Sequence, residues 1–138
     1  MLIKAYGKNI PTTAFSNRFI QGEAFTERIF IELEKMYGEM NLENYDFKIY
    51  GKDANGNEIT TELTKVTTPN AITLAWDVDS LFTATAGKME IEIKGTFNDT
   101  ENNKTRIIKF TMGQITILPS IITKTTETAD DTETSTTP

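Results

Sequence analysis

The sequence contains no cysteine and no histidine among its 138 residues. Without cysteine there is no disulfide and no thiol nucleophile, and a structural zinc site loses both of its usual ligands. Without histidine there is no Ser-His-Asp triad and no side chain whose ordinary pKa suits a general base near neutral pH. These absences predict a protein that is not an enzyme, with no cofactor and no metal ion.

Basic residues and long apolar runs are also scarce. The 14 Lys and Arg residues face 20 Asp and Glu residues, which leaves a net charge of −6. Nucleic-acid binding depends on clustered positive charge, and the sequence has no basic run. No segment approaches the ~18 apolar residues of a membrane span, and the first residues do not resemble a signal peptide. We therefore expect a soluble protein that binds neither nucleic acid nor membrane.

What the sequence does contain is a repeated alternation of apolar and polar residues. Met89, Ile91 and Ile93 alternate with charged neighbours, and residues 25–34, 45–50 and 72–78 follow the same period of two. Such alternation is typical of antiparallel strands with one buried face, and two sheets must bury these faces against each other. The expected core consists of Ile29, Ile31, Leu33, Phe47, Ile49, Leu74, Trp76, Met89, Ile91, Ile93, Ile108 and Phe110.

Turn residues separate the alternating segments at short, even intervals. Asn55-Gly56 predicts a hairpin, Pro69-Asn70 and Ala86-Gly87 each precede a strand, and the polar residues 98–103 join the last two strands. This spacing predicts an all-β fold, an immunoglobulin-like antiparallel β-sandwich of about seven strands formed by residues 1–119.

Two segments leave alternatives open. The apolar positions of the last strand shift by one residue at Gly113, which indicates either a β-bulge or a strand that crosses between sheets. Residues 34–44 could form a helical turn, but Gly38 and Asn41 favour a loop.

The composition changes after Pro119. Residues 120–138 contain eight threonines, four acidic residues and one lysine, so this segment carries −3 and the first 119 residues carry the other −3. Low hydrophobicity with net charge predicts a segment that has no fold in isolation. We expect an extended tail that lies along a neighbouring subunit, with Ile121 and Ile122 anchoring its start.

Carboxylate pairs and one loop are the remaining candidates for chemistry. Asp77/Asp79, Glu90/Glu92 and Glu32/Glu34 are each two residues apart, but they are flanked by lysine and threonine and are typical of solvated strand faces rather than of a glycosidase site. Residues 53–58 resemble a calcium loop. Their glycine is one position early and position twelve is a threonine, so a hairpin turn is favoured.

Aromatic residues outside the alternation are candidates for an interface. Phe30 and Tyr50 fall on the polar side of their strands, while Phe15 and Phe19 lie in a segment of weak periodicity. Exposed aromatic rings anchor protein interfaces or stack on sugars, whereas the ordinary alternative is packing beneath a loop.

A resemblance to a known family rests on three segments. Residues 45–56 (YDFKIYGKDANG), 81–93 (LFTATAGKMEIEI) and 115–121 (ITILPSI) resemble the N-terminal module of upper baseplate proteins from phages of Gram-positive bacteria. The resemblance spans residues 45–122, somewhat over half of the chain. It implies a β-sandwich that packs into a multimeric appendage of the virion.

Two functions therefore stand as hypotheses. In the first, the chain is a virion structural protein of a baseplate, tail, collar, capsid decoration or head fibre, which binds its own copies as a homo-oligomer together with neighbouring virion proteins. In the second, it is a carbohydrate-binding module that recognises a cell-surface glycan.

Overall fold

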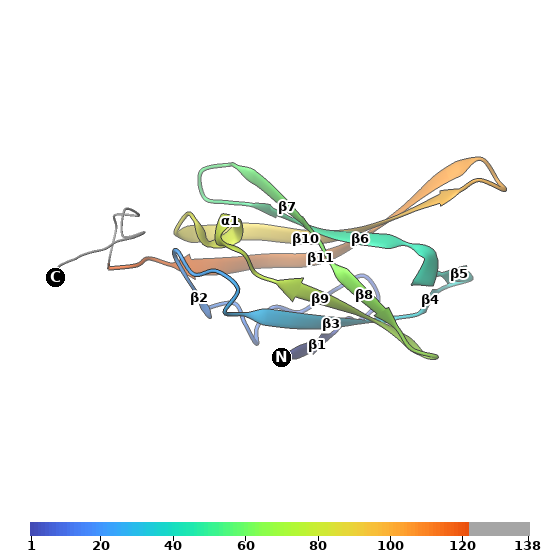
Figure 1. The fold of residues 1–138 in the computed structure, drawn as a ribbon, viewed down its shortest axis with the longest axis horizontal. Coiled ribbons are helices and arrows are strands. Elements are labelled where there is room, and N and C mark those ends of the chain that lie inside the picture. The colour runs from blue at the N-terminus through green and yellow to red at the C-terminus, as the bar shows by residue number, and fades with distance from the viewer. Residues whose placement is uncertain (122–138) are drawn as a thin grey trace.

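The computed structural model describes residues 1–121, in which two β-sheets pack against each other (Figure 1). The elements are β1 (Leu2–Lys4), β2 (Phe19–Ile20), β3 (Arg28–Glu34), β4 (Met36–Tyr37), β5 (Met40–Asn41), a 3₁₀ turn (Leu42–Asn44), β6 (Asp46–Lys52), β7 (Glu58–Glu62), β8 (Thr64–Thr67), β9 (Ala71–Asp77), α1 (Ser80–Thr83), β10 (Gly87–Asp99) and β11 (Lys104–Leu118). Within residues 1–121, no helix has the length and apolar character that crossing a membrane requires.

The strands form a four-stranded sheet in the order β1-β3-β9-β8 and a five-stranded sheet in the order β2-β11-β10-β6-β7, while β4 and β5 pair separately. Two pairings are parallel, β1 with β3 and β2 with β11, and the other pairings are antiparallel. The predicted all-β class is confirmed. Of the eleven strands described, β1, β2, β4 and β5 are only two or three residues long, too short for a period of two to be visible in the sequence.

The core lies between the two sheets. All twelve side chains predicted to be buried are at most 4% exposed. Trp76, on β9, is at its centre, and its ring lies 6.4 Å from Phe15, 6.0 Å from Phe19 and 5.3 Å from Phe82 between ring centroids. Alternation in the strands therefore identified the residues of the two inner faces correctly.

The predicted turns join the expected strands. β6 and β7 meet at Asn55-Gly56, β8 and β9 at Pro69-Asn70, and β10 and β11 at residues 100–103. The polar residues 98–103 were expected to form only a connection, but β10 continues through Asn98 and Asp99. β11 begins at Lys104, and the β10-β11 hairpin extends beyond the rest of its sheet (Figure 1).

The structure decides between the two interpretations of the last strand. β11 stays in one sheet and pairs with β10 from Lys104 to Ile117, and the register shifts where Ile91 faces Gly113 and Glu92 faces Thr111. Met112 is the extra residue of a β-bulge, so Met112 and Ile115 are both buried although three residues apart. The alternative prediction, a strand that crosses between the sheets, is wrong.

Residues 34–44 differ from the loop that was favoured. Met36–Tyr37 and Met40–Asn41 pair as a short hairpin, and a 3₁₀ turn follows at Leu42–Asn44. The Asn41 side chain accepts a hydrogen bond from the Glu43 backbone N–H and thereby caps the turn. Asparagine before a short helical segment was the available signal for it.

Candidate interaction surfaces

Two of the predicted interface residues are in the core. Phe15 and Phe19 are each 1% exposed. Their rings pack edge to face with 6.0 Å between centroids, and both rings also contact Trp76. Their segment has weak periodicity because most of it is a loop that wraps one side of the core. Phe15 and Phe19 therefore have the ordinary packing role, and their assignment to an interface is corrected.

Phe30 lies on the outer face of the four-stranded sheet. Its cross-strand neighbours there are Leu2 on β1 and Ala75 on β9, and the Arg28 guanidinium is 5.2 Å from the centre of its ring. Leu2 is exposed, and Phe30 is half-buried between its neighbours. The outer face of this sheet thus presents an apolar strip, whose binding role stays a prediction.

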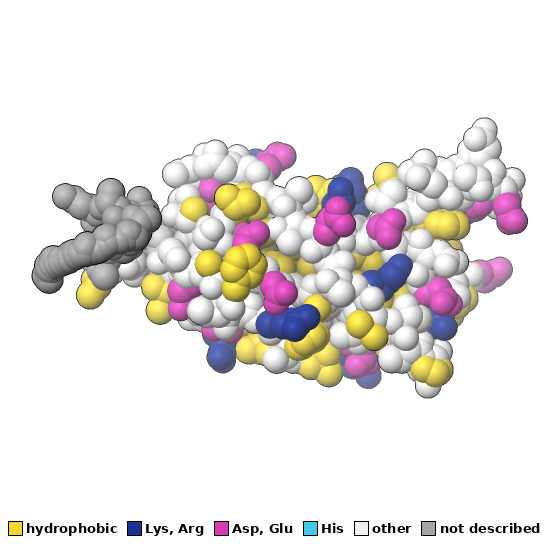
Figure 2. All heavy atoms as spheres, viewed as in Figure 1, with side chains coloured by type: hydrophobic (Ala, Val, Ile, Leu, Met, Phe, Trp, Pro, Cys, Tyr) yellow, Lys and Arg dark blue, Asp and Glu magenta, His cyan; other side chains and the backbone are white. Residues whose placement is uncertain are grey.

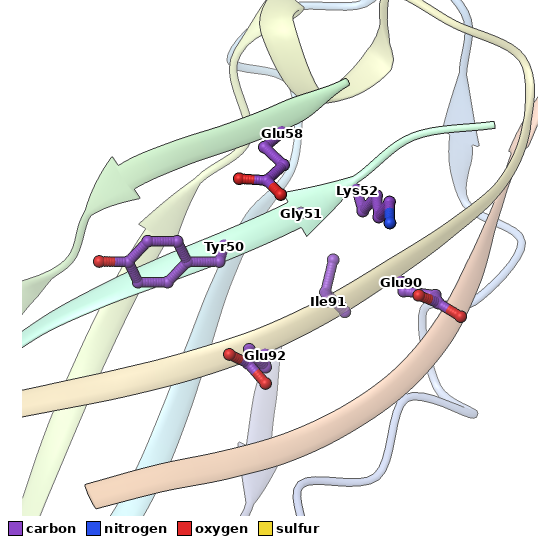
Figure 3. A pocket seen from close by; sticks show the side chains of 7 residues that line it. All are labelled: Tyr50, Gly51, Lys52, Glu58, Glu90, Ile91 and Glu92. Carbon is purple, nitrogen blue, oxygen red and sulfur yellow. The ribbon is translucent and has the colours of Figure 1, made fainter. Parts of the chain in front are cut away.

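Tyr50 lies on the outer face of the five-stranded sheet, beside a hollow of about 250 Å³ that is open to solvent (Figure 3). The hollow is lined by Tyr50, Gly51, Lys52, Glu58, Glu90, Ile91 and Glu92. Its lining therefore contains three carboxylates, one ammonium group and a single aromatic ring. The Lys94 ammonium lies 5.1 Å from the centre of this ring, so one face of Tyr50 is already occupied.

The carboxylate pairs lie where solvated residues were expected. Glu32, Glu34, Glu90 and Glu92 point away from the core. Within residues 1–121, no group of three acidic side chains is arranged to hold a metal ion. The pair at 77 and 79 is split, because Asp77 forms an ion pair with Arg28 at 3.2 Å while Asp79 accepts hydrogen bonds from the first turn of α1.

Asp53 acts within the hairpin turn of residues 53–58. Its Oδ1 accepts hydrogen bonds from the backbone N–H groups of Asn55 and Asn57, both at 2.9 Å. Burial raises the pKa of Asp53, but the hydrogen bonds from Asn57 and Asn55 outweigh it and hold the pKa below its ordinary value. The Asp53 carboxylate therefore accepts hydrogen bonds from the backbone of its own turn, as expected for a hairpin turn rather than for a calcium loop.

Asp99 has the same role at the tip of the β10-β11 hairpin. It accepts hydrogen bonds from Asn102 and from Arg106, whose Nε lies 3.0 Å from Oδ2. The hydrogen bond from the Asn102 side chain, followed by that from Arg106, holds the pKa of Asp99 below its ordinary value.

An apolar surface that was not predicted lies at the end of the molecule where the described chain finishes. We call it the end surface; its exposed hydrophobic residues are Ile20, Phe25, Leu81, Leu118 and Ile121. Hydrophobic side chains are visible beside this end of the chain in Figure 2. The segments that carry them are held together, because Gln21 N–H donates to the Leu118 carbonyl and Gly22 N–H to the Thr83 carbonyl.

Phe25 is the unusual residue of the end surface. Its φ angle is +60° and its side chain is 71% exposed. A bulky side chain in the left-handed region is strained, and glycine would adopt this conformation more easily. A phenylalanine that is both strained and exposed contributes little to its own fold. Sequence reasoning missed it because Phe25 reads as the first apolar residue of the alternation that continues at Ile29.

Of the two residues predicted to anchor the tail, Ile121 is the last residue that the structure describes, and Ile122 lies outside the described residues. Ile121 is 99% exposed, and the Ser120 N–H donates to Gln21 Oε1 at 3.4 Å. The rest of the predicted tail also lies outside the described residues. The extended tail therefore stays a prediction.

Comparison with known proteins identifies no relative, so the function has to be inferred from the surfaces described above. Neither a protein-family model nor a curated protein sequence matches the chain.

Proposed function

We propose that the protein is a non-enzymatic assembly component of a phage particle, which acts through contacts with its own copies and with neighbouring virion proteins. The end surface is the observation that carries this proposal. Five large hydrophobic side chains are exposed on segments that are joined by backbone hydrogen bonds. Exposed apolar patches on an ordered framework mark protein contacts, and an assembly component needs such contacts. The phage context comes from the resemblance of residues 45–122.

We also propose that the fold is of the immunoglobulin-like type. In that fold, strands A, B, E and D form one sheet in the order A-B-E-D, and strands G, F and C form the other. The orders β1-β3-β9-β8 and β11-β10-β6 support this topology, with seven strands in the corresponding sequence positions. The parallel pairing of β1 with β3 departs from a purely antiparallel sandwich.

A second candidate function is a carbohydrate-binding module. The hollow beside Tyr50 supports it, but less strongly than the end surface supports assembly. Glu58, Glu90 and Glu92 could accept hydrogen bonds from sugar hydroxyls. However, the hollow contains one aromatic ring, and Lys94 lies over it. A sugar would have to displace this lysine to stack on that face of Tyr50. Binding of the purified protein to a glycan array, lost in Tyr50→Ser, would favour this candidate over assembly.

The assembly function predicts a separation between folding and incorporation. Full-length Phe25→Ser, Phe30→Ser and Tyr50→Ser variants should unfold at nearly the normal temperature, because none of these side chains is in the core. Each should be incorporated into particles about fivefold less or worse, as for the loss of an interface anchor. The measurement is quantitative mass spectrometry of purified particles assembled with each variant in place of the normal chain.

The matched control is Tyr6→Ser, which removes an exposed aromatic side chain outside these surfaces. It should be incorporated normally. Normal incorporation of all three variants would contradict the proposal.

A further inference from the structure

Three lysines stand side by side across the outer face of the five-stranded sheet. In the register of the strands, Lys48 on β6 faces Lys94 on β10, and Lys94 faces Lys109 on β11. We call these residues the lysine row. Adjacent strands are about 4.8 Å apart, so the three ammonium groups share a strip only about 10 Å wide. The strip lies in the middle of the sheet, where β6, β10 and β11 run together (Figure 1).

The lysine row is unfavourable for the isolated domain. Like charges directly opposite each other on neighbouring strands destabilise a sheet. Part of this repulsion is offset, because Lys94 lies over the Tyr50 ring and Lys109 forms an ion pair with Glu92 at 3.6 Å. Lys48 faces Glu62 on β7, yet neither Lys48 nor Lys94 forms an ion pair within residues 1–121. Two lysines of the row therefore have positive charge available for another segment, in a domain whose net charge is negative.

The chain itself contains a segment of the opposite charge. Glu127, Asp130, Asp131 and Glu133 lie within seven residues, and Lys124 is the one basic residue between Ile122 and Pro138. In an extended chain, Asp131 and Glu133 would point to the same side about 7 Å apart, which fits within the width of the lysine row. We infer that the lysine row is the docking site for this acidic segment, residues 127–133, of a second copy of the chain.

The donor is a second copy because the tail of the same chain is too short. Lys109 precedes Ile121 by twelve residues, which at about 3.3 Å per residue of extended chain is about 40 Å. Figure 1 shows residues 119–121 continuing away from the sandwich after β11, so a tail that returned to the lysine row would have to cover that distance. Counted from Ile121, the reach of Glu127 is about 20 Å and that of Asp131 about 33 Å. Only Glu133 could arrive, with no residue left for the reversal of the chain.

This inference rests on the proposed assembly function, because each copy must meet another. It adds the partner segment and the residues that receive it. The contact is heterologous, since each copy offers its tail at one place and receives a tail at another.

The test uses full-length protein as an equal mixture of copies with natural nitrogen and copies labelled with ¹⁵N. A carbodiimide joins carboxylates directly to lysine amines in contact, and mass spectrometry then identifies the linked peptides and their isotopes. We expect links from residues 127–133 to Lys48, Lys94 or Lys109, with about half of them joining light and heavy copies. Links only within copies of one label, or links spread evenly over all lysines, would overturn the inference.

A second measurement separates binding from folding. A fluorescent peptide of residues 120–138 is titrated with full-length protein and its anisotropy is followed. Lys94→Gln should weaken binding about fivefold or more, and raising the salt from about 50 to 500 mM should weaken it about tenfold. Lys88→Gln is the matched control, because Lys88 is on the same strand and face but is opposite Thr116. It should change the affinity less than twofold.

The stability of the variants distinguishes a docking role from a structural one. Lys94→Gln removes two like-charged cross-strand pairs, so the unfolding temperature should stay equal or rise while peptide binding falls. A peptide in which the four acidic residues are replaced by their amides should bind at least about tenfold more weakly. Equal binding of that peptide, or equal losses in Lys88→Gln and Lys94→Gln, would overturn the inference. Such a result would leave the assembly function intact, because the latter is tested by incorporation of the Phe25, Phe30 and Tyr50 variants.

Discussion

Trp76 shows how far a single residue can be understood from its neighbours in the chain. Its alternation with polar and small residues on β9 places it correctly in the core, and it is the one tryptophan of the sequence. Its contacts with Phe15 and Phe19 come from β2 and the segment that leads into it, and its contact with Phe82 comes from α1, so they have no counterpart in that pattern. The indole Nε1 is buried and has no hydrogen-bond acceptor among residues 1–121. An unpaired buried donor of this kind costs about 1–3 kcal/mol.

Two substitutions of Trp76 should therefore differ more than their sizes suggest. Trp76→Ala should lower the free energy of unfolding by about 3–5 kcal/mol, because it leaves a large cavity in the core. Trp76→Phe also removes volume, but it eliminates the unpaired N–H, so its cost should be less than about 2 kcal/mol. Urea unfolding followed by circular dichroism gives both values, since the variants contain no tryptophan for fluorescence. Equal losses would mean that Nε1 is satisfied by water.

The long hairpin of β10 and β11 is an element whose path was predicted and whose tip was not. Its alternation identified the buried residues, but β10 continues through Asn98 and Asp99, which were expected to belong to a polar loop. At the tip, Asp99 is buried and accepts hydrogen bonds from Asn102 and Arg106. Asp99 and Arg106 lie on opposite sides of the turn that contains Asn102, so their contact follows from the hairpin register rather than from local composition.

The tip also makes the hairpin sensitive to acid. The pKa of Asp99 is lower in the folded protein than its ordinary value of about 3.9, so ionised Asp99 stabilises the fold at and above that pH. This stabilisation should be lost as the pH falls from about 4 through the lower folded pKa. Asp99→Asn should unfold more easily than the normal chain at pH 7, with a smaller difference near pH 2. Thermal unfolding at both pH values measures this, and a difference that does not shrink in acid would contradict it.

Elements built without periodicity were the ones that the sequence did not predict. β1 and β2 each join the edge of a sheet through parallel pairing with a distant strand, β1 with β3 and β2 with β11. Two or three residues cannot display an alternation, and nothing local specifies a partner 28 or 98 positions away. The shift in alternation at Gly113 was visible because a long strand makes a shift of one residue recognisable, but only the pairing with β10 shows that it is a β-bulge.

Of the twelve large hydrophobic residues exposed within residues 1–121, five belong to the end surface. The end surface combines the β2-β3 loop, α1 and the end of β11, and the outer face of the four-stranded sheet adds Phe30 and Leu2. Each segment alone looks like an ordinary loop or strand. Their meeting at one end creates the end surface, on which the proposed assembly function depends.

Phe25 connects this surface to stability. Phe25→Gly relieves a strained φ angle of +60° but makes the unfolded chain more flexible, so the free energy of unfolding should change by less than about 1 kcal/mol. Incorporation into particles should nevertheless fall as it does for Phe25→Ser, because the aromatic anchor is gone. Chemical unfolding and particle composition together check this. A loss of several kcal/mol would instead give Phe25 a structural role.

The sequence by itself determined the all-β class, the inner faces of the strands, the hairpin turns and the twelve buried residues, because these depend on a period of two and on local turn chemistry. Only the tertiary structure decided that Phe15 and Phe19 are core residues, since a loop shows no period. It also decided that Gly51 and Gly95 must lack side chains. A Cβ atom there would lie 2.8 Å from the Phe82 ring and 2.7 Å from the Phe47 ring, contacts that exist only after the elements have packed. The lysine row follows the same rule, because Lys48, Lys94 and Lys109 become neighbours only through the register of three strands.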